Sequence, residues 1–214
     1  MMPDHHRVIG LTGNLGAGKS TVGRIAGELG ARVIDSDQTV RDLLANDPEL
    51  ALSIERAFGA EVMLDGRPDR AALARIVFHD PAELARLEAT IYPRVGERTA
   101  ELLAESTVAA ATVIEAIKIV EGPNVDRLDA LWLVEATPEV QIERATATGR
   151  ISAAEARRRL AVQSRPDAKE GLFRARRPGR PVWRIDNSTD LQDLQQRVAA
   201  AWRETLAYGD GPTS

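Results

Sequence analysis

The 214-residue sequence contains no cysteine, which excludes disulfide bonds, thiolate metal sites and thiol nucleophiles. It has no apolar stretch of membrane-spanning length, and its first residues lack an apolar signal region, so we expect a cytoplasmic protein without membrane contacts. It also has no excess of basic charge: the formal net charge is −4, which argues against a nucleic-acid partner. The hydrophobic fraction of 43% and the charged fraction of 28% are those of an ordinary globular protein.

One stretch fits the phosphate-binding pattern G-x-x-x-x-G-K-[ST] at every fixed position. It follows the apolar run 8–11 and consists of Gly13, Asn14, Leu15, Gly16, Ala17, Gly18, Lys19 and Ser20, with Thr21 next along the chain. The glycines let the backbone N–H groups turn inward toward phosphate oxygens, and the start of the following helix adds partial positive charge. The alternative is a glycine-rich turn that binds no ligand. We favour a nucleoside triphosphate site in which Lys19 reaches the β- and γ-phosphates and Ser20 binds Mg²⁺.

Short apolar runs alternate with helical patterns along the chain. Helical spacing is found at 21–29 and at 191–206, and strands are expected at residues 8–11, 32–34, 111–114, 130–134 and 182–185. This alternation predicts the α/β class: a doubly wound, parallel five-stranded sheet of the P-loop NTPase or kinase type.

We expect a single domain spanning 1–214, with a core formed by residues 7–37, 108–148 and 181–206. Between the second and third strands lies a mostly helical insertion, 38–107, interrupted at Asp47-Pro48, at residues 65–68 and at Asp80-Pro81. Each interruption offers a capping Asp or a Pro where a new helix can begin. A second helical segment, 149–180, is expected to form a lid.

Two acidic residues, Asp35 and Asp37, follow the second predicted strand. Ligands of open parallel sheets collect at the carboxyl ends of the strands, so a carboxylate there can accept a proton from a substrate hydroxyl or orient Mg²⁺ through water. The alternative is that the acids or Ser36 only cap the next helix. We predict a catalytic role for Asp37, capping by Ser36 and support of the loop by Asp35.

The predicted lid is strongly basic, although the whole chain is acidic. Three acids accompany ten basic residues: Arg150, Arg157, Arg158, Arg159, Arg165, Lys169, Arg174, Arg176, Arg177 and Arg180. Arginines that close over a transferring phosphoryl group stabilise its charge, and a closed lid excludes water. Nucleic-acid binding and a solvated surface are the competing interpretations. The segment contains only one aromatic residue, Phe173, so we favour the lid.

The third strand ends at Glu115, an acid that can act through Mg²⁺-bound water. Lys118 follows in an apolar setting, either as a contact to substrate phosphate or as a surface lysine whose stem lies on apolar neighbours. The Asn-Lys-x-Asp motif with which GTPases recognise guanine is absent.

Several motifs together resemble the dephospho-CoA kinase family. They occur in order over nearly the whole chain: residues 10–13 leading into the phosphate loop, 34–37, 70–73 with 77–78, 87–88 with Pro93, the lid helix from Arg157 to Gln163, and 185–188. The acid pair at 35 and 37 and the Ile-Asp-Asn at 185–187 are the most discriminating part of this resemblance.

The resemblance implies ATP-dependent phosphorylation of the ribose 3′-hydroxyl of dephospho-CoA, the last step of coenzyme A synthesis. It further implies that Asp37 is the base or hydroxyl-orienting group and that Thr12 lies near the phosphates. By the same resemblance, the insertion binds dephospho-CoA, and the lid, with Arg144 at its base, covers ATP.

The chain departs from the family pattern in the insertion and the lid, whereas the ATP-binding core is intact. Tyr92 stands where the family has histidine, and Gly96 where it has arginine, with Arg94 and Arg98 nearby. Residues 117–119 and 174–180 also differ. Two alternatives therefore stay open: a kinase of the same fold with another acceptor, such as a nucleoside monophosphate or a metabolite, and a non-catalytic nucleotide-dependent binding protein.

Overall fold

The computed structural model describes residues 6–78, 80–105, 108–147, 149 and 151–208. Its chain forms two compact units, one of residues 1–34 and 107–214 and the other of residues 35–106. Arg150 and the ends of the predicted 1–214 domain lie outside the described residues.

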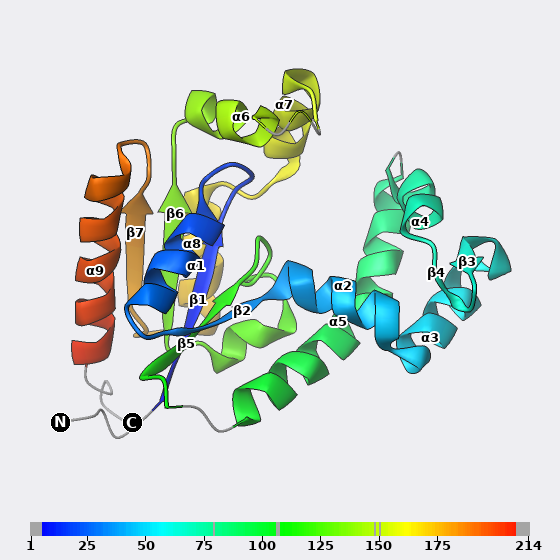
Figure 1. Ribbon diagram of the computed structural model, residues 1–214, viewed down its shortest axis with the longest axis horizontal. Helices are drawn as coiled ribbons and strands as arrows, with labels where there is room; N and C mark the ends of the chain where they lie inside the picture. The colour runs from blue at the N-terminus through cyan, green and yellow to red at the C-terminus, as the bar shows by residue number, and fades with distance from the viewer. Residues whose placement is uncertain (1–5, 79, 106–107, 148, 150, 209–214) are drawn as a thin grey trace. The chain divides into compact units, whose positions relative to one another are not determined.

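The first unit is built on a sheet of five strands in the order β2-β5-β1-β6-β7 (Figure 1). The strands are β1 (Arg7–Gly13), β2 (Arg32–Asp35), β5 (Ala111–Glu115), β6 (Ala130–Glu135) and β7 (Val182–Asp186). The pairs β1–β5, β1–β6 and β6–β7 are parallel. The predicted α/β class with a parallel five-stranded sheet is confirmed, and the sheet brings the strand ends that follow Gly13, Glu115 and Asp186 to one edge.

Helices of the first unit are α1 (Lys19–Glu28), α6 (Pro138–Thr146), α7 (Ala153–Val162), α8 (Pro166–Arg176) and α9 (Leu191–Ala207), with a short helix η2 (Pro123–Arg127). Helices α1 and α9 share one apolar core with the sheet. In that core the Trp132 indole donates a hydrogen bond to Thr205 at 2.9 Å and meets Trp202 edge to face. These contacts hold α9 against β6.

The second unit contains α2 (Ser36–Asn46), α3 (Pro48–Phe58), η1 (Ala60–Val62), the two-stranded hairpin β3 (Met63–Leu64) and β4 (Arg67–Pro68), α4 (Arg70–Val77) and α5 (Pro81–Ala104). Its own apolar core is centred on Leu50, Ile54, Val62, Leu73 and Ile91. As predicted, Asp47 and Asp80 cap the helices that follow them, each accepting backbone N–H hydrogen bonds.

Two local predictions in the second unit are wrong. The helical pattern is interrupted at 65–68 as predicted, but neither Asp65 nor Pro68 starts a helix: Asp65 and Gly66, which both have positive φ, form the turn between β3 and β4, and the cap of α4 is Asp69. The cap of α2 is Asp35, whose carboxylate accepts from the Gln38 N–H at 3.0 Å, whereas Ser36 is the first helical residue. An Asp side chain caps as well as a Ser, so the sequence alone does not decide between neighbouring candidates.

Within the part of the chain that the structure describes, no helix combines the length and the apolar character needed to span a membrane.

Candidate functional site

The phosphate loop connects β1 to α1, and two of its glycines allow it to pack closely on neighbouring backbone. Gly16 and Gly18 have φ values of 72° and 95°, a region that L side chains rarely adopt. A Cβ on Gly16 would lie 2.1 Å from the Gln141 carbonyl oxygen, and one on Gly18 would lie 2.0 Å from the Asn187 Nδ2. The pattern glycines therefore let the loop fit between α6 and the residue that follows β7.

Helix α1 begins directly at this loop, and its N-terminal turn has no side-chain cap among the described residues. The first N–H groups of a helix have no partner within the helix, so here they are available to an anion. The Lys19 ammonium lies 3.4 Å from the Asn14 carbonyl oxygen, across the same loop. This arrangement suits the phosphates of a nucleotide.

Ser20 and Glu115 form an oxygen pair beside the start of α1. The exposed Ser20 hydroxyl donates a hydrogen bond to a Glu115 carboxylate oxygen at 2.8 Å. Glu115 ends β5, which is paired with β1, so the sheet register places the acid opposite Leu11 and close to the loop. A hydroxyl and a carboxylate are the hard oxygen ligands that Mg²⁺ prefers, and Mg²⁺ keeps waters and substrate phosphates as its other ligands. The two residues therefore fit a magnesium site, although no group of three or more His, Asp or Glu suited to a metal occurs in the described ranges.

Three further side chains contact the loop from other elements. The Gln163 Oε1 accepts from the Leu15 N–H at 2.9 Å. The buried Asn187 side chain donates to the Ala17 carbonyl oxygen at 2.8 Å. Arg144 donates to the Asn187 carbonyl oxygen at 2.8 Å, which places its exposed guanidinium beside the loop. Of these contacts, that of Gln163 was not expected from the residues, because a glutamine at the end of a basic helix carries no signal of its own.

Thr12 lies on β1 with its side chain fully buried. Its hydroxyl donates a hydrogen bond to the Ile117 carbonyl oxygen at 2.8 Å. The hydroxyl thus joins β1 to the segment that follows Glu115, and in this structure its contact is to protein backbone.

Lys169 on α8 is buried, with a side chain only 1% exposed, although the sequence groups it with the basic surface of the lid. Its ammonium donates to the Ile117 carbonyl oxygen at 2.6 Å and lies 3.3 Å from a Glu121 carboxylate oxygen. Burial lowers the pKa of Lys169, and the nearby Glu121 opposes that shift. Its spacing of four residues from the buried Phe173 was a signal that it lies on the inner face of α8.

Most lid arginines are paired with acids in this structure. Arg158 and Arg159 bind Glu155, and that pairing lowers the pKa of the Glu155 carboxyl. The remaining pairs are Arg174 with Glu170, Arg176 with Asp126 and Arg180 with Asp129. Arg176 and Asp126 are both exposed, and an exposed ion pair of this kind contributes about 0–1 kcal/mol.

In the second unit, Asp37 lies in the first turn of α2 with an exposed side chain. Because Asp35 performs the capping, the Asp37 carboxylate is not used as the cap of this helix. An exposed carboxylate that does not cap its helix can orient a substrate hydroxyl or accept its proton.

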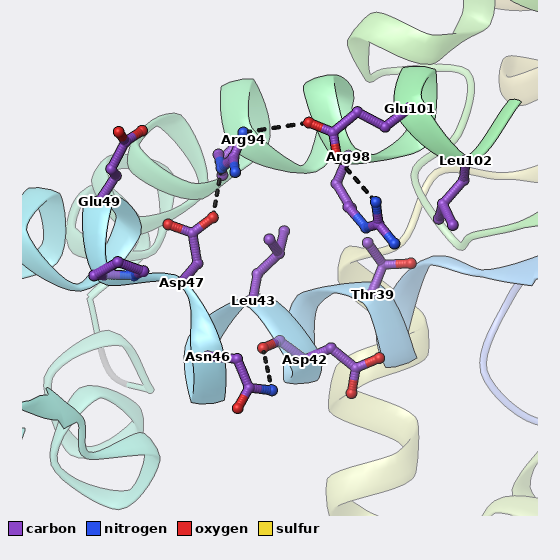
Figure 2. Close-up of a pocket in the computed structure, with 11 residues that line it drawn as sticks. Thr39, Asp42, Leu43, Asn46, Asp47, Glu49, Arg94, Arg98, Glu101 and Leu102 are labelled. Carbon is purple, nitrogen blue, oxygen red and sulfur yellow. Dashed lines mark hydrogen bonds and ion pairs between the residues drawn. The ribbon is translucent and has the colours of Figure 1, made fainter. Parts of the chain in front are cut away.

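The second unit also contains a cavity of about 560 Å³ between α2, the start of α3 and α5 (Figure 2). Arg94 and Arg98 reach it from α5, and both are paired with acids. Arg94 lies 2.5 Å from Asp47, whose side chain is buried, whereas Arg98 lies 2.9 Å from the exposed Glu101. Arg94 is therefore held in a structural contact between α5 and the start of α3, and Arg98 is the more available of the two guanidiniums.

The Asp47–Arg94 pair predicts acid sensitivity of the second unit. Burial alone would raise the pKa of Asp47, but hydrogen bonds from the Leu50 N–H and from Arg94 outweigh it and lower the pKa below the ordinary 3.8. Because the folded-state pKa is the lower one, the stabilisation is present above pH 3.8 and disappears as the pH falls through the folded-state value. We expect the melting temperature to drop over this range in the native protein and to drop less in D47N, since Asn keeps the cap without the charge. Equal pH profiles by thermal circular dichroism would contradict this assignment.

Comparisons with known proteins agree with this geometry. The family model for dephospho-CoA kinase matches residues 7–192. A dephospho-CoA kinase of Geobacter metallireducens is 38% identical over 202 residues, covering 93% of this chain and 96% of the relative. A crystal structure from Thermus thermophilus is 32% identical with a TM-score of 0.74, covering 94% of this chain and 98% of that one. A dephospho-CoA kinase structure from Campylobacter jejuni has a TM-score of 0.56 at 20% identity, over 94% and 97% of the two chains, and shows the fold alone.

Proposed function

The chain belongs to the dephospho-CoA kinase family, and from this premise we propose that it transfers the γ-phosphate of ATP to the ribose 3′-hydroxyl of dephospho-CoA, giving coenzyme A. The observation that carries the proposal is the family match over residues 7–192, which includes an intact phosphate loop, the insertion and the lid. A cytoplasmic location and the absence of nucleic-acid and membrane partners stay predictions from the sequence.

In the proposed reaction, the loop from Gly13 to Thr21 binds the ATP phosphates through its N–H groups and the start of α1. Lys19 neutralises the β- and γ-phosphates, and Arg144 approaches from α6. The positive φ of Gly16 and Gly18 supports this role, because it allows the backbone itself to line the site. Catalysis of this kind comes from positioning and charge neutralisation.

Ser20 and Glu115 are proposed to hold Mg²⁺, Ser20 directly and Glu115 through Mg²⁺-bound water. When bound, the ion neutralises charge on the phosphate oxygens. The 2.8 Å contact between the two side chains supports a shared site, since both oxygens already converge on one place.

Asp37 is proposed to orient the acceptor hydroxyl, with the insertion 38–107 binding dephospho-CoA and the lid 149–180 covering ATP. Within the insertion we assign the contact with the acceptor phosphate to Arg98, because Arg94 is occupied by the buried Asp47.

The resemblance to the family implies that Thr12 lies near the phosphates. Its hydrogen bond to the Ile117 carbonyl oxygen supports a role in positioning the loop region.

The proposal is tested by ADP release from ATP and Mg²⁺ in the presence of different acceptors: dephospho-CoA, AMP, CMP and shikimate. We expect strong stimulation by dephospho-CoA alone. Stimulation by another acceptor would mean that Tyr92 and Gly96 belong to an acceptor site with a different substrate specificity. Tight ATP binding without stimulation by any of the four would favour a nucleotide-dependent binding protein.

A further inference from the structure

The contact between Gln163 and the phosphate loop connects two segments that are 148 residues apart in sequence. Gln163 directly follows α7 as its C-cap, and the acceptor in the contact is its side-chain carbonyl oxygen. We propose that Gln163 is a positioning residue that couples the phosphate loop to the lid helix α7, so that nucleotide bound at the loop orders the helix. This inference rests on the proposed function in one respect: the loop must be a nucleotide site.

Few buried side chains anchor helix α7 among the described residues. Ala156 is its one buried residue among those described, and Val162, next to Gln163, is 85% exposed. Because little of the helix is buried, the partly buried hydrogen bond of Gln163 contributes to fixing this end of α7.

The partner of Gln163, the Leu15 N–H, lies within the loop that is proposed to bind the phosphates. Leu15 stands between Asn14, whose carbonyl oxygen faces the Lys19 ammonium, and Gly16, which has positive φ. A movement of the loop backbone on phosphate binding therefore also moves the Leu15 N–H. On the helix side, Arg157 and Arg159 lie one to two turns before Gln163, so a hydrogen bond that positions the end of α7 also bears on the part of the helix that carries them.

The chemistry of glutamine suits this position. Its amide oxygen accepts the Leu15 N–H without placing a negative charge beside a phosphate site, whereas a glutamate would accept the same bond and repel the ligand. Leucine has a similar size and cannot accept a hydrogen bond. The pair Q163L and Q163E therefore separates the hydrogen bond from the charge.

The test is hydrogen exchange of peptides covering residues 153–163, with and without ADP and Mg²⁺. In the native protein we expect ADP to slow exchange in these peptides. In Q163L we expect that slowing to decrease about two- to tenfold, the range corresponding to one neutral hydrogen bond. By linkage, the affinity for ADP should fall by the same factor, while the melting temperature stays close to that of the native protein.

Q163E is expected to keep the slowing at saturating ADP, with weaker ADP binding, and Q195L on the exposed face of α9 is the matched control and should behave like the native protein. Full ADP-dependent slowing in Q163L, its absence in the native protein, or its loss in both Gln163 variants would overturn the proposal. The assay needs no acceptor, so a native protein that shows the coupling but does not phosphorylate dephospho-CoA would contradict the proposed function and leave the coupling intact.

Discussion

Replacing Lys19 with alanine is expected to lower kcat by about two to three orders of magnitude, as for other groups that stabilise charge only where it develops. The Lys19 ammonium is held across the phosphate loop, 3.4 Å from the Asn14 carbonyl oxygen, in the position from which it can neutralise the β- and γ-phosphates. Its side chain takes no part in the apolar core, so the fold should be preserved. The measurement is kcat and KM for ATP, with circular dichroism to check folding.

Arg203→Ala is the matched control for this variant, because Arg203 is an exposed basic residue on α9 whose side chain donates a hydrogen bond to the Ala199 carbonyl oxygen of its own helix. The control should keep native activity. A nearly normal kcat in K19A, with the fold intact, would remove the phosphate loop from the reaction and with it the assignment as a kinase.

Asp37→Asn is expected to lower kcat by about 10²- to 10⁴-fold, the usual contribution of a general base or of a group that orients the attacking hydroxyl. The expectation follows from the exposed position of Asp37 in the first turn of α2 and from the capping of that helix by Asp35. Asn keeps the shape and removes the charge, so ATP affinity should be unchanged. The measurement is single-turnover phosphoryl transfer together with ATP binding by calorimetry.

Asp65→Asn is a suitable control in the same unit, since Asp65 is exposed at the tip of the hairpin and its positive φ suits Asn equally well. Loss of ATP binding in D37N would show that Asp37 serves a metal or the loop and does not align the acceptor. Unchanged kcat would exclude Asp37 from the chemistry.

The parallel sheet and the phosphate loop could be predicted from sequence because their signals are local. The fixed spacing from Gly13 to Ser20 and the short apolar runs are each read within about ten residues. The position of Glu115 beside Ser20 was also accessible, since an acid at the end of a strand paired with β1 must lie near the loop.

The features that could not be predicted depend either on contacts between residues far apart in sequence or on which of two adjacent residues caps a helix. Gln163 reaches Leu15 across 148 positions, and no local pattern marks either partner. Lys169 was grouped with exposed lid residues, because composition does not show that Glu121 and a backbone carbonyl oxygen would compensate its burial. The cap of α2 was assigned to Ser36 instead of Asp35, an error of one residue between two good capping side chains.

The most direct test of the central claim is to identify the product formed from ATP, Mg²⁺ and dephospho-CoA. Phosphorus NMR and mass spectrometry together report where the phosphoryl group goes. The account predicts coenzyme A, with one new phosphate monoester on the ribose 3′-hydroxyl and one ADP for each molecule formed. Unchanged dephospho-CoA, under conditions in which ATP binds and another acceptor is phosphorylated, would contradict it.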